Sequence, residues 1–304
     1  MKNALFYYYK FNVDKLIKKN NYYFFENDNY FYYLYPVIRP KEYIFSLKYL
    51  NQYLINTKYM EIVFNIFNDI VSLINNHQYI LLRQRKEIKF SIDDFFNPYY
   101  INININNSNL KTFDHSDWYK LFSSKIDYFE YQKSFIKVKY PLLYKTMDYY
   151  IGLSENAISY FYACNKYLGK NNTDNLVLSR RRIDLLDDSV YNPLNVVIDN
   201  RARDIGEYLK FLFLSNDYDD IKIEAFLLRL NFSSYQYSLV MDRVLFPSFY
   251  FDLYEEIINE SRREEDIIPI LKRSGEYEVF LKMIYDVLNK NKSIIRIDWL
   301  DRFN

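Results

Sequence analysis

The sequence predicts an α+β chain in which a small, strand-containing part precedes a larger and mainly helical part. Residues 22–38 resemble a β-hairpin, because two aromatic runs flank the turn-forming residues 26–29. From Ser116 onwards, apolar residues recur with the spacing of amphipathic helices over most of the chain. We therefore expect two domains, at residues 1–86 and 87–304.

Three further elements are expected in the first part. A helix follows Pro40, whose fixed φ suits a first helical position. Thr57 is expected to cap a second helix that carries apolar residues as far as residue 73. Residues 79–82 have the composition of a buried strand. Beyond them, isoleucines alternate with asparagines over residues 101–105, which indicates a half-exposed strand or an extended linker.

The second part is expected to contain several helices. One covers residues 118–129, and another begins at a Ser154 cap and ends at Gly169. Pro247 interrupts an apolar run and precedes a further helix, and a final helix covers residues 277–288.

The stretch from residue 194 to residue 210 combines a strand, a charged corner and a helix. Residues 196–198 are apolar and β-branched, and Asp204 stands where a helix N-cap belongs, with Glu207 three residues later as in a capping box. We expect Arg203 and Asp204 to be buried and hydrogen-bonded, with Asp204 capping a helix that begins at residue 205. Asp199 is expected to tolerate replacement by Asn.

Composition excludes several classes of protein. The chain has 40 Lys+Arg against 39 Asp+Glu and a net charge of +1, so nothing in its overall charge points to a nucleic-acid partner. The single cysteine, Cys164, excludes an internal disulfide and suits the cytosol. No apolar run has the roughly 20 residues of a membrane span, and no signal peptide is evident. We expect a cytoplasmic protein without membrane insertion.

Other candidate sites have weak signals. His77 and His115 are the only histidines and have no metal ligands at suitable spacing, so no metal site is expected. Cys164 lies on an apolar helix face, which indicates a core thiol. The basic cluster at residues 180–182 is expected to be neutralised by the aspartates at 184, 187 and 188.

Four segments resemble the spore coat kinase-like (CotS) family, in particular its YutH-type branch. They are residues 118–127, residues 149–160, residues 199–210 and residues 243–252. Within them, the signature positions are Gly152, Glu155, Asn156 and Pro247. The resemblance implies the two-lobed protein-kinase-like fold of aminoglycoside phosphotransferases and choline kinases, with a small β-containing N-lobe and a large, mainly helical C-lobe.

The parts that such a fold needs for phosphoryl transfer are largely absent. No glycine precedes Gly152, although a glycine-rich loop usually covers the nucleotide phosphates. No lysine-bearing strand of the kinase type is evident in residues 1–86. The related phosphotransferases carry His-Gly-Asp-x-x-x-x-Asn in the catalytic loop, whereas residues 178–182 contain neither the His nor the Asp.

We therefore expect a pseudokinase with a structural or scaffolding role and no cofactor. Family resemblance implies spore coat proteins as partners, synthesis in the mother-cell cytoplasm and deposition in the spore coat. The alternative is an active small-molecule kinase that uses Mg-ATP, with Asp187, Asn192 and Asp199 as its degenerate catalytic positions. A third option is a protein that binds single-stranded nucleic acid through exposed tyrosines, since 35 Tyr are present.

Overall fold

The computed structural model describes residues 1–19, 21–101, 109–169, 176–292 and 294–303. The chain divides into two compact units. The first unit, the sheet unit, comprises Met1–Asp114 and Asp184–Ile198, and the second, the helical unit, comprises His115–Ile183 and Asp199–Asn304. Residues 87–114 and 184–198, which we expected in the C-terminal domain, thus belong to the sheet unit.

Hydrogen bonds explain why residues 184–198 join the sheet unit. The Asp188 carboxylate accepts from the backbone N–H of Phe90 at 2.8 Å and from Lys89 Nζ at 3.1 Å. The Tyr43 hydroxyl donates to the carbonyl oxygen of Leu194 at 3.0 Å. These contacts join sequence-distant segments, so the linear pattern does not show them.

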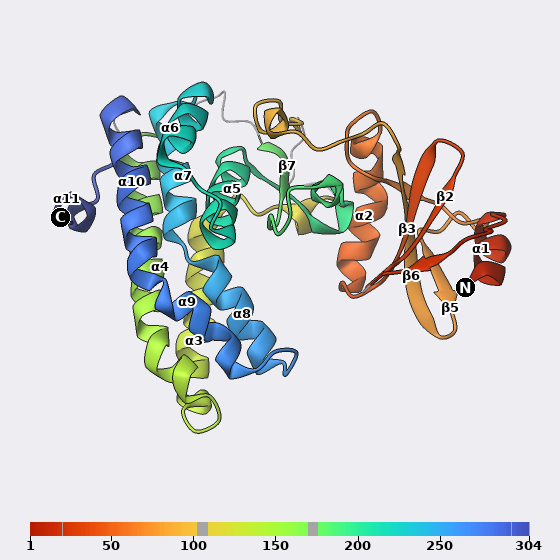
Figure 1. The fold of residues 1–304 in the computed structure, drawn as a ribbon, viewed down its shortest axis with the longest axis horizontal. Coiled ribbons are helices and arrows are strands. Elements are labelled where there is room, and N and C mark those ends of the chain that lie inside the picture. The colour runs from red at the N-terminus through yellow and green to blue at the C-terminus, as the bar shows by residue number, and fades with distance from the viewer. Residues whose placement is uncertain (20, 102–108, 170–175, 293, 304) are drawn as a thin grey trace. The chain divides into compact units, whose positions relative to one another are not determined.

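A six-stranded antiparallel sheet organises the sheet unit (Figure 1). The order is β1-β2-β3-β6-β4, and β5 also pairs with β6. The strands are β1 (Ile17–Lys18), β2 (Tyr23–Asn27), β3 (Tyr30–Pro36), β4 (Glu61–Val63), β5 (Val71–Ile74) and β6 (His77–Arg85). The predicted hairpin is confirmed as β2 and β3, and the predicted strand at 79–82 is the centre of β6.

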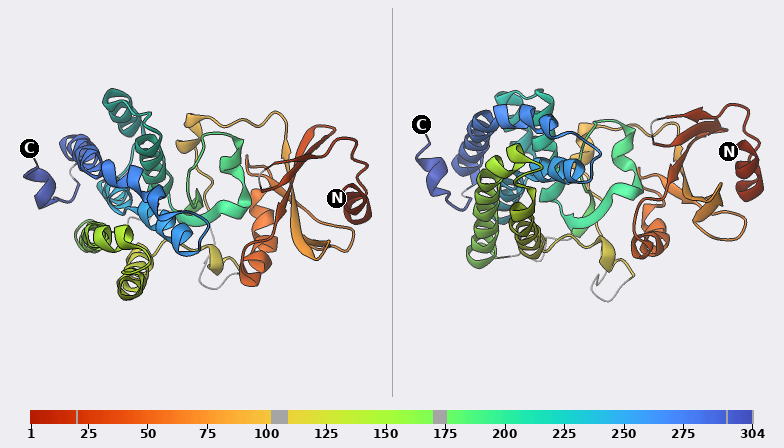
Figure 2. Two further views of the ribbon diagram at one scale, coloured as in Figure 1. Left: turned by 60° about the horizontal axis from the view of Figure 1, so that its bottom comes forward. Right: turned by 90° about the horizontal axis from the view of Figure 1, so that it is seen from below.

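Two helices lie on opposite sides of this sheet (Figures 1 and 2). On one side, α1 (Lys2–Tyr9) buries Leu5 and Tyr9 against a sheet face that includes Phe25 and Leu81. On the other side lies α2 (Lys41–Leu54), the helix expected after Pro40. Each face of the sheet is thereby covered.

The helix predicted from Thr57 to residue 73 is wrong, because this segment forms β4, a loop and β5. The Asn65 side-chain oxygen accepts from the backbone N–H of Phe67 at 2.9 Å and from that of Asp69 at 3.1 Å. Such side-chain to backbone bonds stabilise a turn in place of a helix. Of the segment 101–105, Ile101 is buried, and the other residues lie outside the described part of the chain.

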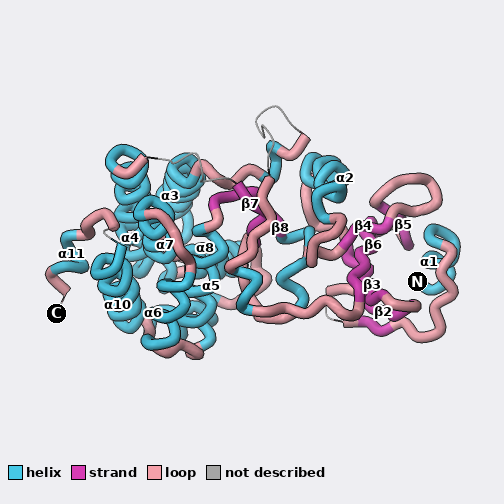
Figure 3. The backbone as a smooth tube through the Cα atoms, turned by 90° about the horizontal axis from the view of Figure 1, so that it is seen from above, coloured by secondary structure: helices cyan, strands magenta, loops and turns pink. Residues whose placement is uncertain are grey.

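The helical unit is dominated by helices (Figure 3). In it, α7 packs against α4, α5 and α10. The helices are α3 (Trp118–Ile136), α4 (Pro141–Tyr167), α5 (Ala202–Ser215), α6 (Asp220–Arg229), α7 (Ser234–Leu245), α8 (Ser248–Ile258), α9 (Ile268–Lys272), α10 (Ser274–Lys292) and α11 (Asp298–Asp301). Two short strands, β7 (Leu176–Arg180) and β8 (Val196–Asn200), precede α5, and β8 runs from the sheet unit into the helical unit.

The helix predicted to start at Ser154 begins earlier, so that prediction is wrong: Ser154 lies inside α4. Its hydroxyl donates to the carbonyl oxygen of Tyr150, four residues earlier, at 2.8 Å, so the helix continues through it. Pro141 occupies the first turn instead, and Gly169, with φ of 67°, follows the helix as predicted. Within the described residues, no helix is long and apolar enough to span a membrane.

Candidate functional site

The candidate site begins where β8 leads into α5. The helix starts at Ala202, whose backbone N–H donates to the side-chain oxygen of Asn200 at 2.8 Å. The N-cap position is Arg201, which makes no capping bond through its side chain, and the preceding Asn200 binds the first helical N–H instead. The expectation that Asp204 caps a helix beginning at residue 205 is wrong. Asp204 lies within the first turn of α5, where its side chain bonds to another segment.

Asp199 is fully buried and accepts hydrogen bonds on both carboxylate oxygens. Trp118 Nε1 lies 2.9 Å from each oxygen, the backbone N–H of Asn200 donates to Oδ1, and Arg203 Nη1 donates to Oδ2 at 2.7 Å. Burial raises the pKa of Asp199, and the positive charge of Arg203 opposes that shift. Since one partner of a buried ion pair is costly to remove, the geometry argues against the expected tolerance of Asn at this position.

Arg203 and Asp204 both hold the end of β7. Arg203 Nε donates to the carbonyl oxygen of Arg180 at 3.0 Å, and its Nη2 donates to that of Arg181 at 3.1 Å. Asp204 accepts from the backbone N–H and from Nη1 of Arg180, each at 2.7 Å. The first turn of α5 is thus fixed to the chain at residues 180–181 by bonds to main chain and side chain.

Glu207 is the centre of a second group of buried charges, one turn along α5. Its Oε1 lies 2.8 Å from Lys210 Nζ and 2.7 Å from Arg243 Nε, and Arg182 Nη1 is 3.8 Å away. Although burial opposes ionisation, these positive charges hold the pKa of Glu207 well below its usual range. The spacing of Glu207 from Asp204 predicted a capping box, but Glu207 does not act as the partner in one.

Lys210 is also enclosed, and its ammonium donates to Ser248 Oγ at 2.7 Å. Burial, only partly offset by Glu207, lowers the pKa of Lys210 to about 7. The residue is 2% exposed, as is Ser248, so this hydrogen-bonded pair has no contact with solvent that would admit a substrate.

Gly206 permits the close approach of α5 to α7. A Cβ atom at this position would lie 2.5 Å from Arg243 Cγ and 2.6 Å from Arg243 Cβ. The Arg243 side chain passes the helix at this point and places its guanidinium 5.5 Å from the ring of Trp118. Glycine is therefore required for packing at residue 206 and not for flexibility.

Two of the arginines at 180–182 pair with carboxylates other than the neighbouring aspartates that we expected. Arg180 pairs with Asp204, and Arg182 makes a two-pronged contact with Asp252 on α8. Asp188 pairs with Lys89 in the sheet unit. Buried neutralisation here comes from distant segments, which sequence proximity does not reveal.

The structure gives Asp187 and Asn192 local roles. Each caps a short 3₁₀ helix: Asp187 accepts from the backbone N–H of Ser189 at 2.8 Å, and Asn192 accepts from that of Leu194 at 2.9 Å. Both lie in the sheet unit, whereas Asp199 lies in the helical unit. Within the described residues, no group of three or more His, Cys, Asp or Glu side chains could hold a metal ion.

The signature positions separate into exposed and structural ones. Glu155 and Asn156 are exposed on α4, and the space beside Gly152, where a Cβ would lie, is open. Asn156 Nδ2 donates to the carbonyl oxygen of Gly152 at 2.8 Å. Pro247 is buried and separates α7 from α8. Cys164 is buried in the helical core, as predicted.

Sequence reasoning missed four side chains of this buried network: Trp118, Arg180, Lys210 and Arg243. A signal was present for two of them, because Lys210 and Arg243 stand inside otherwise apolar helical stretches. A charge on the buried face of a helix needs a partner, so such positions point to an internal ion pair. The identity of that partner depends on the fold.

Comparisons with solved structures confirm the predicted fold class. An aminoglycoside phosphotransferase from Alicyclobacillus acidocaldarius superposes with a TM-score of 0.57 and 10% identity, over 91% of this chain and 92% of the other. The spectinomycin phosphotransferase APH(9)-Ia, in complex with ADP and spectinomycin, gives a TM-score of 0.53 and 9% identity, over 94% and 97%. At these identities the likeness concerns the fold alone.

Sequence comparisons identify the family. The "Endospore coat-associated protein YutH" of Bacillus subtilis (strain 168) is 27% identical over 212 residues, and the match spans 61% of this chain and 61% of that relative. The model of the family described as "Spore coat putative kinase YutH" matches residues 2–284. The chain therefore belongs to this spore coat family, as its sequence segments predicted.

Proposed function

We propose that this chain is a catalytically inactive kinase-fold protein with a structural role in the spore coat. The observation that carries the proposal is the closed network of buried charges around α5. In the related phosphotransferases a catalytic aspartate stands in the loop that corresponds to residues 178–182. Here the arginines at 180–182, at the end of β7, bond instead to Asp204, Glu207 and Asp252. Guanidinium groups cannot take a proton from an acceptor hydroxyl at neutral pH, so they do not replace a catalytic base.

The nucleotide-binding side supports the same proposal. The loop between β1 and β2 has no glycine, since none occurs before Gly152. The third strand, β3, reads Tyr-Phe-Tyr-Tyr-Leu-Tyr-Pro and supplies no lysine for the phosphates.

Metal binding has little support in this geometry. Asp199 has three donors on its two oxygens and no exposure to solvent, so a metal ion would have to displace Arg203 or Trp118. Asp187 and Asn192 would have to give up the backbone bonds that they make as caps. We therefore propose that the chain works without Mg-ATP or another cofactor.

The name of the Bacillus subtilis relative supports a place in the coat. With it we propose other coat proteins as partners and synthesis in the mother-cell cytoplasm. The alternative, an active Mg-ATP-dependent small-molecule kinase, draws support from the phosphotransferase fold and from the spacing of Asp187 and Asn192.

A fluorescent fusion expressed in sporulating Bacillus subtilis separates the two functions. We expect the wild-type fusion to surround the forespore and then the mature spore. A variant with both Asp187→Ala and Asn192→Ala should assemble equally well, because only local caps are lost. Failure of the wild-type fusion to reach the coat contradicts the structural role. A variant that remains soluble but abolishes a measurable kinase activity supports the alternative.

A further inference from the structure

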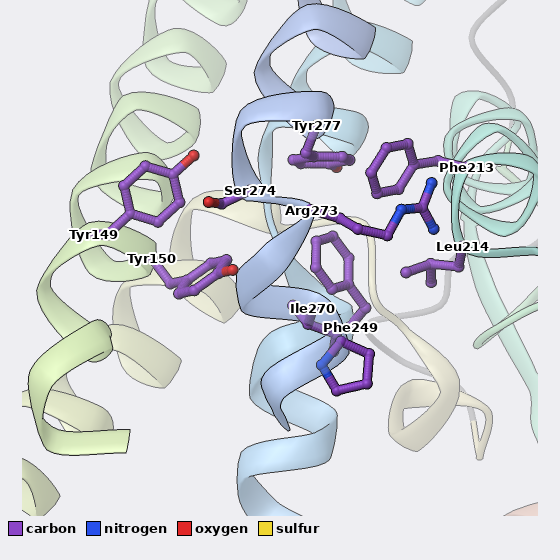
Figure 4. Close-up of a pocket in the computed structure, with 10 residues that line it drawn as sticks. Tyr149, Tyr150, Phe213, Leu214, Phe249, Ile270, Arg273, Ser274 and Tyr277 are labelled. Carbon is purple, nitrogen blue, oxygen red and sulfur yellow. The ribbon is translucent and has the colours of Figure 1, made fainter. Parts of the chain in front are cut away.

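A small apolar cavity of about 90 Å³ lies within the helical unit (Figure 4). Its lining comes from α4, α5, α8, α9 and α10. Helices distant in sequence therefore contribute to one partly open cavity, and nothing in the proposed coat role uses it.

The walls of this cavity are aromatic. Phe213, Phe249 and Tyr277 line it, and the rings of Phe249 and Tyr277 meet edge to face at 5.0 Å. The Arg273 guanidinium lies 4.2 Å from the centre of the Phe213 ring and is bonded to Glu276 at 2.7 Å. Since Arg273 already has a carboxylate partner, the wall favours a neutral aromatic ring over an anion.

One polar group in the cavity lacks a partner. The Tyr150 side chain stacks on Tyr250, with ring centres 3.8 Å apart, and the residue is 2% exposed. Its hydroxyl points from α4 toward the centre of the lining residues in Figure 4 and, within the described chain, makes no hydrogen bond. Burial raises its pKa, so the hydroxyl keeps its proton and remains a donor.

Other tyrosines that line or adjoin the cavity do have hydrogen-bond partners. Tyr149 donates to Glu278 at 2.8 Å, and Tyr277 donates to the carbonyl oxygen of Val244. Tyr250 lies 3.1 Å from the Thr146 hydroxyl. A buried hydroxyl without a partner is costly, and an acceptor brought by a ligand would remove that cost.

We propose that this cavity binds a small, neutral molecule with a single aromatic ring and one hydrogen-bond acceptor. The ring packs against Phe213 and Phe249, and the acceptor receives the proton of the Tyr150 hydroxyl. An apolar cavity of about 150 Å³ holds a whole benzene molecule. This cavity is smaller, so one ring is the most that it can take, and part of the ligand stays at the opening beside the half-exposed Leu214. This site is independent of the proposed coat function.

Three probes test the proposal by calorimetric titration of the full chain: benzamide, toluene and acetamide. Benzamide has both a ring and a carbonyl acceptor, toluene has the ring alone, and acetamide has the acceptor alone. We expect saturable binding in the order benzamide, toluene, acetamide. Tyr150→Phe should raise the dissociation constant of benzamide about fivefold, equivalent to one hydrogen bond of about 1 kcal/mol. The dissociation constant of toluene should stay unchanged.

A filled cavity provides the second arm. Leu214 lines the cavity and is 42% exposed, so Leu214→Trp can place an indole there without burying a new polar group in the core. Leu228→Trp on α6, at a position 44% exposed and outside the cavity, is the matched control. We expect the first variant to lose benzamide binding and the control to keep it.

Absence of benzamide binding to the folded wild-type chain overturns the proposal. So does binding that Leu214→Trp leaves intact, or equal affinity for benzamide and toluene, which would mean that water alone satisfies Tyr150. A raised melting temperature of Tyr150→Phe without ligand, together with its fivefold loss for benzamide, supports the assigned role of the hydroxyl.

Discussion

The sheet unit and the helical unit bury different kinds of side chain. Polar residues buried in the sheet unit are neutral: Ser46, Asn65, Ser72, Gln84 and Asn192. In the described part of the chain, the buried ion-paired residues all belong to the helical unit, namely Arg180, Asp199, Arg203, Asp204, Glu207, Lys210 and Arg243. Asp242 is buried there as well, and burial raises its pKa well above the usual range. A neutral polar group needs one or two hydrogen bonds, whereas a buried charge needs an opposite charge as well. We therefore expect single substitutions to have far larger effects in the helical unit.

The largest effect is expected at Glu207. Glu207→Gln leaves Lys210 and Arg243 buried without their shared carboxylate, which should lower the free energy of unfolding by roughly 3–5 kcal/mol. Chemical denaturation measures the change. Glu155→Gln on the exposed side of α4 is the matched control and should be nearly neutral. If the two variants are equally stable, the network around Glu207 does not stabilise the fold.

The next largest effects are expected at Asp199, Asn192 and Asp187, the three catalytic positions that an active kinase would use. Asp199→Asn strands the Arg203 guanidinium and should cost roughly 3 kcal/mol. Asn192→Ala loses a cap in the sheet unit and should cost about 1 kcal/mol. Asp187→Ala, at an exposed cap, should cost at most as much as Asn192→Ala. Thermal melts of the three variants give the order, and a neutral Asp199→Asn would restore the expectation drawn from sequence alone.

Gly206 tests the packing of α5 against α7. Gly206→Ala removes a poor helix former, which on its own would stabilise the helix by about 1 kcal/mol. The added Cβ would lie 2.5 Å from Arg243 Cγ, so we expect a net loss, since overpacking costs roughly 1–3 kcal/mol. Gly275→Ala on α10, where no atom lies within 4 Å of the new Cβ, is the control and should not destabilise. A more stable Gly206→Ala variant would show that the two helices separate easily.

The smallest effect concerns pH. Burial and the charges of Arg203, Arg181, Arg243 and Arg182 lower the pKa of His115 from 6.5 to about 3. Between these values the unfolded chain binds a proton that the folded chain does not, so His115 reduces stability as pH falls from 6.5 toward 3. His115→Gln should flatten the decline of melting temperature in that window and leave the value at pH 7 almost unchanged. A decline of the same slope in both proteins would exclude His115 as its source.

Part of this architecture was predictable from local pattern. The β2–β3 hairpin has aromatic runs around a turn, and α3 has apolar residues at helical spacing, so each is specified by its own segment. The error at residues 57–73 arose because the same apolar residues suit a helix or two short strands, and Asn65 decides between them through its backbone bonds.

The candidate site was only partly predictable. The sequence indicated that Arg203 and Asp204 would be buried, and they are. It placed the hydrogen bonds of Asp204 at the start of α5, whereas in the structure Asp204 bonds to Arg180 at the end of β7. Partners such as Trp118 with Asp199, or Arg243 with Glu207, are far apart in the chain. Periodicity shows which face of a helix is buried but not which distant charge meets it.

The most direct test of the central claim is the melting of the wild-type chain with Mg-ATP. We predict no stabilisation at millimolar Mg-ATP, because Asp199 is closed by Arg203 and Trp118 and no glycine-rich loop is present. A nucleotide at 100 times its dissociation constant would add about 2.7 kcal/mol to the free energy of unfolding. A stabilisation of that size, lost in both Asp187→Ala and Asn192→Ala, would contradict the proposal that the chain is a catalytically inactive kinase-fold protein. It would establish these residues as part of a nucleotide site.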